Sequence, residues 1–188
     1  MVHTSLYKAD NKQLLHPGQY GSRPNRRATD PVLLKELQLE MSRITRKTLI
    51  QTNYDATACY DRIIPSLAMI VSQKYGVHSK VTTTNAVTLR NAEYRIRTDL
   101  GMSPRGYAHS QQRPINGTGK GSGNSPAIWC FLSSTLYDCY DTQATKALYC
   151  APNRTNHLEI GMIGFVDDSN GQTNQFLADE TETTVDEV

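Results

Sequence analysis

Two segments of this 188-residue chain end in aspartates that could share one site. Asp55 closes a run whose composition predicts a short strand, and Asp167 and Asp168 open a predicted hairpin turn, 167–171, after the predicted strand 160–166. Carboxylates on neighbouring strands suit phosphoryl transfer, because they can hold two divalent cations about 3.5–4 Å apart. Mg²⁺ prefers such hard oxygen ligands and keeps waters for the substrate phosphates. The three aspartates therefore predict a metal site, provided that the two strands lie side by side.

Each of these features also has an ordinary structural explanation. An aspartate at a strand end is often a turn or capping residue, and Asp-Asp before Ser-Asn-Gly is often a solvated turn. The glycine-rich loop Arg113–Ser125 lacks the Lys-Ser/Thr pair of a phosphate-binding P-loop. The chemistry is therefore a hypothesis that depends on the features occurring together.

Helical patterns occupy much of the chain around these segments. Asp30 as N-cap and Pro31 at the first helical position predict a helix that ends near Thr48. Its expected buried face consists of apolar residues at helical spacing, namely Leu33, Leu34, Leu37, Met41 and Ile44. A second helix is predicted around another apolar face, made of Ile63, Ile64, Leu67, Ile70 and Val71. Pro65 near its first turn and Gly76 as its C-cap mark the ends of this second helix.

Two further helices and one strand complete the expected order. A helix is predicted from Ser79 to about Asn91, and Tyr94–Thr98 alternates as a strand does. Pro126 opens the last helix. Its expected buried residues are Ile128, Trp129, Leu132 and Leu136. This order of helices and strands predicts one domain of the α+β or mixed α/β class, of which we expect α+β.

Charge is distributed unevenly along a chain whose net charge is only +2. Residues 1–50 carry +5, residues 51–150 carry +4, and residues 151–188 carry −7. A basic body is compatible with a phosphate-backbone partner. The acidic end has few apolar residues, so 173–188 is predicted to be a disordered tail, after a poorly defined segment 1–18 and a folded region 19–172.

Cysteine usage and hydropathy limit the cellular setting. The four cysteines are widely spaced and form no CxxC pair, which favours reduced, mostly buried thiols over a zinc site. No apolar run approaches the roughly 20 residues of a membrane helix, and the N-terminus lacks the apolar core of a secretory signal. We therefore expect a protein of the cytoplasm or nucleus, not secreted and with no membrane partner.

Four segments, in order, resemble motifs of reverse transcriptases. Tyr54–Ile63 is similar to the first palm motif, with an aspartate, an aromatic five residues later and a further aspartate. Gly117–Pro126 is similar to the second, a glycine loop that closes on Ser-Pro at a helix start. Phe165–Asp168 resembles the third, an aromatic residue, any residue and two aspartates. Upstream, Gln19–Asp30 resembles the segment before the first motif in retrotransposon and group II intron enzymes.

This resemblance implies a polymerase palm, an antiparallel sheet backed by helices, that copies an RNA template into DNA from a DNA primer and dNTPs. It implies that Asp55, Asp167 and Asp168 are the catalytic residues and bind two Mg²⁺ or Mn²⁺ ions. The ordered set of motifs spans residues 19–169, about four-fifths of the chain.

The resemblance also assigns residues around the nucleotide. It places the backbone of Ala56 at the metal, and Tyr60 under the incoming sugar, where the ring would exclude a 2′-hydroxyl. The nucleotide would further contact Lys120, Gly121 and Ser125. Each assignment has a structural alternative, which for Tyr60 is a core aromatic residue.

Template and primer contacts are assigned to basic residues of the upstream segment. Arg23 and Arg26 are the residues implied to line the template and primer. Arg26 could equally be a solvated loop charge, so both explanations stay open.

The chain departs from the family pattern in two ways. Reverse transcriptases normally carry Gln where this chain has Lys120, which puts nucleotide positioning in doubt. The resemblance does not extend to the start of the fingers or to a thumb, so we expect an incomplete polymerase that additional segments or a second chain would complete. Two alternatives remain, a catalytically inactive, palm-derived nucleic-acid-binding module and an RNA-dependent RNA polymerase palm. The bulk of Tyr60 argues against the RNA polymerase.

Overall fold

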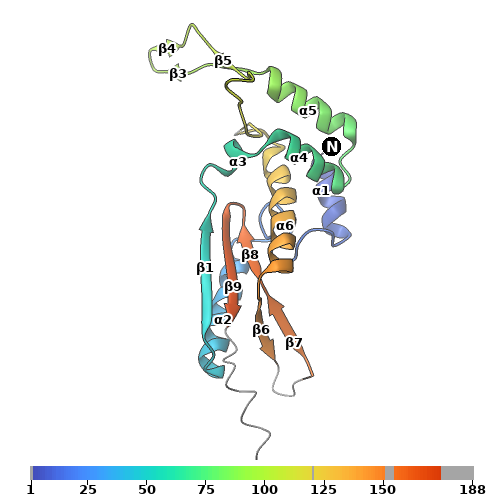
Figure 1. The fold of residues 1–188 in the computed structure, drawn as a ribbon, viewed down its shortest axis with the longest axis vertical. Coiled ribbons are helices and arrows are strands. Elements are labelled where there is room, and N and C mark those ends of the chain that lie inside the picture. Colours follow the sequence, from blue (N-terminus) through green and yellow to red (C-terminus); the bar gives the residue numbers. More distant parts are fainter. Residues whose placement is uncertain (1, 120, 151–154, 175–188) are drawn as a thin grey trace, which may run out of the picture. The chain divides into compact units, whose positions relative to one another are not determined.

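The computed structural model of the chain describes residues 2–119, 121–150 and 155–174, which form a mixed α+β structure (Figure 1). This part of the chain holds six helices and small antiparallel sheets, which confirms the predicted α+β class. The chain divides into two compact units. Unit 1 comprises Met1–Leu15 and Thr57–Thr135, and unit 2 comprises His16–Ala56 and Leu136–Val188.

Unit 1 is mostly helical. Its helices are α1 (Val2–Asn11), α3 (Cys59–Arg62), α4 (Pro65–Lys74), α5 (Ser79–Asn91) and the first part of α6 (Ser125–Gln143). Its strands are β2 (Glu93–Tyr94), β3 (Arg97–Thr98), β4 (Gly101–Met102) and β5 (Tyr107–Ala108). β2 pairs with β5 and β3 pairs with β4, both antiparallel.

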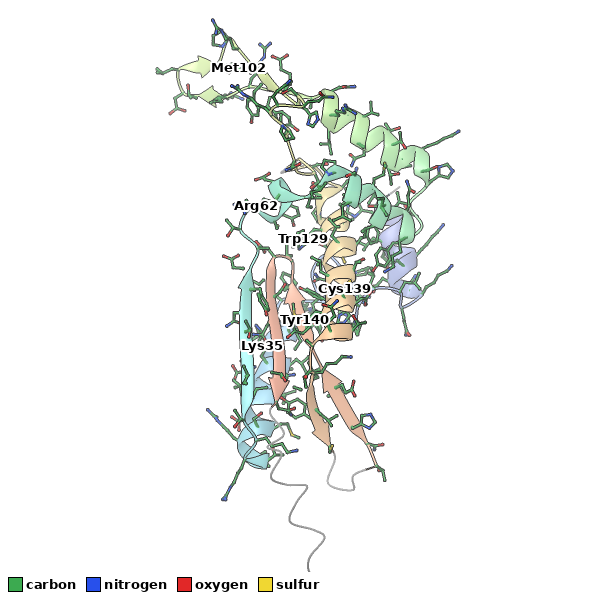
Figure 2. All side chains as sticks on the ribbon, in the orientation of Figure 1. Lys35, Arg62, Met102, Trp129, Cys139 and Tyr140 are labelled. Atoms are coloured by element: carbon green, nitrogen blue, oxygen red, sulfur yellow. The ribbon has the colours of Figure 1, made fainter. Side chains whose placement is uncertain are left out.

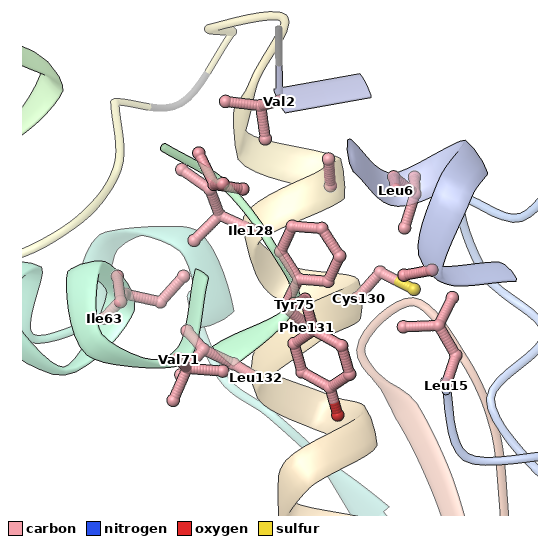
Figure 3. Packing of buried hydrophobic residues seen from close by; sticks show 14 residues of the cluster. Val2, Leu6, Leu15, Ile63, Val71, Tyr75, Ile128, Cys130, Phe131 and Leu132 are labelled. Carbon is pink, nitrogen blue, oxygen red and sulfur yellow. The ribbon is translucent and has the colours of Figure 1, made fainter. Parts of the chain in front are cut away.

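The core of unit 1 gathers around α6, as Figure 3 shows. Phe131 is fully buried, and its ring stacks on that of Tyr75 at a centroid distance of 4.9 Å. Helix α1 adds Val2, Leu6 and Ala9 to this core. The helix lies in the segment 1–18 that was expected to be poorly defined, and its few apolar residues recur at helical spacing.

Unit 2 is built on a three-stranded antiparallel sheet. Its elements are α2 (Thr29–Thr45), β1 (Leu49–Asp55), the end of α6, β6 (Ala147–Cys150), β7 (His157–Ile160), β8 (Met162–Phe165) and β9 (Asp168–Asn174). The strand order is β1-β9-β8, with β9 in the middle, and β6 and β7 form a separate hairpin (Figure 1). β1 and β9 pair over seven residues, from Leu49 opposite Asn174 to Asp55 opposite Asp168. The predicted strand that delivers Asp55 is confirmed.

A loop before α2 extends this sheet beyond β8. The Gly164 amide donates to the Gly18 carbonyl, and the Tyr20 amide donates to the Gly164 carbonyl, both at 2.8 Å. Gln19 and Gly164 form a parallel bridge. A Cβ on Gly18 would overlap the backbone oxygen of Met162, and one on Gly21 would overlap the backbone nitrogen of Val166. The two glycines therefore let the loop lie directly against β8.

The face that α2 buries differs from the predicted one. Its buried residues are Pro31, Gln38 and Ser42, whereas Leu33 and Ile44 are 61% and 75% exposed. The helix thus turns a proline and two polar side chains inward and leaves most of its apolar stripe exposed. The predicted helix ends also shift, because Ala28 is the N-cap, Asp30 lies inside the first turn and the helix ends at Thr45.

Other predicted elements are confirmed in part. Helix α5 has the predicted bounds, and Gly76 has the left-handed φ of 83° expected after a helix end. Helix α4 buries Val71 but leaves Ile64, Leu67 and Ile70 exposed. Helix α6 buries Ile128 and Leu132, Trp129 packs partly against the core, and Leu136 is exposed. The predicted strand 94–98 is split between β2 and β3.

The remaining expectations concern cysteines, membrane spans and the tail. The four cysteines form no disulfide, with Cys59 and Cys130 buried and Cys139 and Cys150 exposed, so the expectation of mostly buried thiols holds for two of the four. Among the described residues, no helix has the length and apolar character needed to cross a bilayer. Thr173 and Asn174, assigned to the acidic tail, belong to β9, and 175–188 lie outside the described residues.

We predict that Gly18→Ala destabilises the protein, because its new methyl group meets a backbone oxygen that cannot move aside. Overpacking of this kind costs about 1–3 kcal/mol of the free energy of unfolding. Urea denaturation followed by circular dichroism measures it. Gly123→Ala is the matched control, since a Cβ there meets nothing within 4 Å. Equal stability of the two variants would contradict the contact between the loop and β8.

Candidate functional site

Two of the three predicted metal-binding aspartates face each other across the sheet. Asp55, the last residue of β1, lies opposite Asp168, the first residue of β9. Directly opposite residues of an antiparallel pair share a face, and their Cβ atoms are about 4.5–5.5 Å apart. Both side chains are exposed to solvent. The structure thus brings Asp55 and Asp168 together, as expected from strands that lie side by side.

The third aspartate lies in the turn that joins β8 to β9. Phe165 pairs with Asp168, so Val166 and Asp167 form a two-residue hairpin turn. The expected turn over 167–171 is therefore wrong, because residues 168–171 belong to β9. Val166 has a φ of 57°, a value that is unfavourable for a β-branched side chain. Strain of this kind costs about 1–3 kcal/mol and persists only where the surrounding structure enforces it.

A row of side-chain amides leads along β9 toward the two carboxylates. Asn170 donates to Asn53 Oδ1 at 2.7 Å, and Gln172 donates to Asn170 Oδ1 at 2.8 Å. Asn170 and Gln172 are fully buried. The strand pairing places Asn53 and Asn170 opposite each other on the face that carries Asp55 and Asp168. The bond from Asn170 to Asn53 joins β9 to β1 and holds the two strands in register beside the carboxylate pair, whereas the bond from Gln172 lies within β9 and orients the Asn170 amide.

This amide row was not found from the sequence, although a signal for it is present. On both strands every second residue is polar and carries an amide or a carboxylate: Gln51, Asn53 and Asp55 on one, and Asp168, Asn170, Gln172 and Asn174 on the other. A period of two indicates a strand with a polar face. Because Asp-Ser-Asn-Gly was interpreted as a turn, the second half of the pattern was missed.

A cavity of about 360 Å³ opens beside the carboxylate pair within unit 2. Asp55 and Asp168 line it from the strands, and Pro31, Val32 and Lys35 line it from α2. Lys35, labelled in Figure 2, is half-buried and is the basic residue of this lining. The cavity therefore combines acidic groups with one cation, which is compatible with a ligand that carries both metal ions and phosphates.

The opposite face of the sheet is covered by the end of α6. Tyr137 and Ser169 share a hydrogen bond of 2.6 Å between their hydroxyl groups. The Tyr140 hydroxyl lies close above Gly171, where a Cβ would come within 2.7 Å of it. Partial burial raises the pKa of Tyr140 above its ordinary value, and the nearby Tyr54 raises it further. Tyr140 therefore remains a neutral packing residue at physiological pH.

The carboxylate pair has the donor chemistry that a magnesium ion requires. Like charges placed directly opposite in a sheet destabilise it, and a cation between Asp55 and Asp168 would remove that cost. Mg²⁺ needs only one or two carboxylates, because water and substrate phosphates complete its coordination. Among the described residues no group of three or more His, Cys, Asp or Glu side chains converges as metal ligands. A metal held here would thus depend on Asp55 and Asp168, with Asp167 in the adjoining turn.

The residues assigned to nucleotide binding lie in unit 1, apart from Ala56, which directly follows β1. Tyr60 is half-buried and packs edge-to-face on Trp129, with ring centroids 6.3 Å apart. The Thr118 amide donates to the Tyr60 carbonyl at 2.9 Å. The structure thus brings Tyr60 and the glycine loop together. The half-buried ring of Tyr60 is compatible both with contact to a nucleotide and with a role in packing against Trp129.

The backbone of the glycine loop adopts left-handed conformations at three positions. Gly117, Gly119 and Gly121 all have positive φ, between 79° and 106°, which only glycine adopts readily. Ser125 is buried, and its hydroxyl donates to the carbonyl groups of Thr118 and Gly119. Ser125 therefore closes the loop onto the start of α6. Lys120 lies outside the described residues.

The two arginines assigned to the template have local partners within unit 2. Arg23 donates to the carbonyl groups of His16 and Gln19, at 3.0 and 2.9 Å. The Arg26 guanidinium lies over the Tyr20 ring, 5.3 Å from its centroid. The hydrogen bonds of Arg23 thus stabilise the loop beside β8, whereas the side chain of Arg26 is exposed to solvent.

Comparison with known proteins adds no relative to these observations. No model of a protein family matches the chain, and no curated protein matches it.

We predict that Asp55→Asn stabilises the protein in the absence of divalent cations. The change removes a like-charge pair, and the new amide can donate to Asp168 as Asn170 donates to Asn53. The gain in the free energy of unfolding should be on the order of a few tenths of a kcal/mol, because solvent screens the exposed pair. Thermal denaturation with EDTA and with Mg²⁺ measures it.

The same experiment tests the metal site. Mg²⁺ should raise the melting temperature of the unsubstituted protein and leave that of Asp55→Asn unchanged. Glu36→Gln, which neutralises an exposed carboxylate of α2, serves as the matched control and should keep the Mg²⁺ response. A similar Mg²⁺ response in Asp55→Asn would place cation binding elsewhere.

Proposed function

We propose that this chain is the palm portion of a reverse transcriptase of the retroelement type, which joins deoxynucleotides to a DNA primer on an RNA template. The observation that carries the proposal is the register that sets Asp55 opposite Asp168, with Asp167 in the turn before it. The Asp55–Asp168 pair offers two carboxylates at one end of the sheet, and Mg²⁺ can complete its coordination with water and substrate phosphates.

Further support comes from the surroundings of the aspartates. A two-residue hairpin turn needs a positive φ at its first residue, and here that position holds the β-branched Val166 directly before Asp167 and Asp168. A cavity with Lys35 on its wall lies beside the carboxylates. The glycine loop, which resembles the second palm motif, is tied to the backbone of Tyr60.

The proposed roles follow from these positions. Asp55 and Asp168 would hold Mg²⁺ or Mn²⁺, together with Asp167. When bound, two such cations activate the attacking hydroxyl and stabilise the leaving phosphates. Tyr60 would contact the sugar of the incoming nucleotide. Ser125 keeps the loop 117–125 in place, so its contribution to nucleotide binding is indirect.

A primer-extension assay tests this proposal with the full-length protein in which this chain occurs, an RNA template, a DNA primer and dNTPs. Incorporation should require Mg²⁺ or Mn²⁺, and Asp55→Asn and Asp168→Asn should each reduce it by at least about a hundredfold, since each removes a metal ligand. Glu36→Gln should retain activity. Template binding without incorporation in the unsubstituted protein would favour a nucleic-acid-binding module instead.

Sugar selection provides a separate prediction for Tyr60. Replacing Tyr60 with Val should raise the incorporation of ribonucleotides relative to deoxynucleotides by about tenfold or more, because the smaller side chain leaves room for a 2′-hydroxyl. Competition between rNTP and dNTP in primer extension measures the ratio. Tyr60→Phe retains the ring against Trp129 and should keep the original discrimination. If Tyr60→Val lowers only the melting temperature, the residue is a core aromatic.

A further inference from the structure

Unit 1 carries a two-stranded ribbon, Glu93–Ala108, that has no buried residue. Tyr94 and Tyr107 pair at its base, and Arg97 and Met102 pair near its tip. Ser103 links the two ladders, since its amide donates to the Ile96 carbonyl at 2.8 Å. Figure 1 shows the ribbon continuing from the end of α5. An isolated ribbon of two strands is only marginally stable in water, so a binding partner would stabilise it.

The ribbon exposes an unusual amount of apolar surface for its length. Its exposed apolar side chains are Ile96 at 62%, Leu100 at 101%, Met102 at 62% and Tyr107 at 55%. Met102 is labelled in Figure 2. Leu100, in the turn between β3 and β4, is as accessible as in an extended peptide. Clustered exposed apolar side chains mark interaction sites more often than single ones do.

Arginines are interleaved with these apolar side chains. Arg95 forms an exposed ion pair of 3.0 Å with Glu93. Among the described residues, neither Arg97 nor Arg105 has an acidic partner within ion-pair distance, and both are exposed. Outside the Arg95–Glu93 pair, the ribbon therefore carries two positive charges, on Arg97 and Arg105, and one negative charge, on Asp99 in the turn.

The two tyrosines at the base supply a rigid aromatic surface. The rings of Tyr94 and Tyr107 are stacked, with centroids 5.3 Å apart and planes 20° apart. Tyr94 is half-buried and supports Tyr107, whose other surface remains accessible. An aromatic ring already held in place binds a further planar group with little additional loss of conformational entropy.

We propose that the ribbon Glu93–Ala108 is a binding arm for an unpaired nucleic-acid strand, with a base stacked on Tyr107 and phosphates held by Arg97 and Arg105. An unpaired strand presents apolar base faces and anionic phosphates at short intervals, which matches the alternation of apolar and arginine side chains here. A duplex hides its base faces, so it would use the arginines and leave the apolar surface exposed. The arm would act independently of the carboxylate site.

Fluorescence anisotropy with a labelled, unpaired oligonucleotide of mixed sequence tests the proposal. Tyr107→Ala should weaken binding about tenfold, the effect of losing one stacked base. Tyr7→Ala is the matched control, because Tyr7 is a tyrosine of the same unit with 54% exposure, and it should bind as the unsubstituted protein does. Tyr107→Phe keeps the ring and should restore binding, and thermal denaturation confirms that each variant is folded.

The salt dependence of the same binding reports on the arginines. Arg97→Ala and Arg105→Ala should each reduce the slope of log affinity against log salt by about 0.7, since one phosphate contact is lost. Arg43→Ala, a change at an exposed arginine of α2, should leave the slope unchanged. All titrations contain EDTA, so that they stay independent of catalysis.

Three results would overturn the proposal. Equal affinity for a blunt duplex and for the unpaired strand would remove the role of Tyr107 in stacking. Unchanged binding by folded Tyr107→Ala would do the same. The third result is that the unsubstituted protein sediments with anionic phospholipid vesicles and does not bind the oligonucleotide, while Leu100→Ser no longer sediments with the vesicles. This result would show that the arm is a membrane-surface element.

Discussion

The antiparallel register of β1 and β9 controls the position of every group in the carboxylate site. A slip of one residue would move Asp55 opposite Asp167 or Ser169 and turn its neighbours to the wrong face. Several contacts prevent such a slip, including the partly buried bond from Asn170 to Asn53 and the two-residue turn at Val166. On the other face Gly171 must stay beneath Tyr140, since any larger residue would collide with its ring. Both faces of the sheet thus specify one alignment.

Two local features of this alignment raise the free energy of the folded state. The opposed carboxylates repel each other, and Val166 adopts a backbone conformation that suits glycine better. The carboxylate repulsion does not help the sheet to fold, whereas the positive φ of Val166 is required by the two-residue turn, and both features lie at the same end of the hairpin. The buried amide row and the loop at Gly18 stabilise the surrounding strands, so that the strained end remains in place. Stability and the candidate chemistry therefore reside in adjacent parts of one sheet.

Local signals predicted the elements better than their packing. The strand ending at Asp55 and the bounds of α5 followed from composition and spacing. The buried face of α2 could not be predicted in that way, because helical periodicity identifies an apolar stripe without revealing that the opposing sheet face is polar. The turn before β9 was misplaced because Asp-Ser-Asn-Gly has strong turn propensity, which pairing with β1 on one side and β8 on the other overrides. Of the site, the aspartates were predicted, whereas the amide row and Lys35 depend on long-range pairing.

The separation of β1 from β9 along the chain has a consequence for biosynthesis. Asp55 and Asp168 are 113 residues apart, so contacts of high contact order hold this sheet together and should make its folding slow. At about 5–20 residues per second, a ribosome needs roughly 6–24 s to complete β9 after it has made β1. During that interval β1 lacks its pairing partner and presents open backbone groups. The charge of Asp55 at its end opposes pairing between such strands of different chains, and this lowers the tendency of β1 to aggregate on the ribosome.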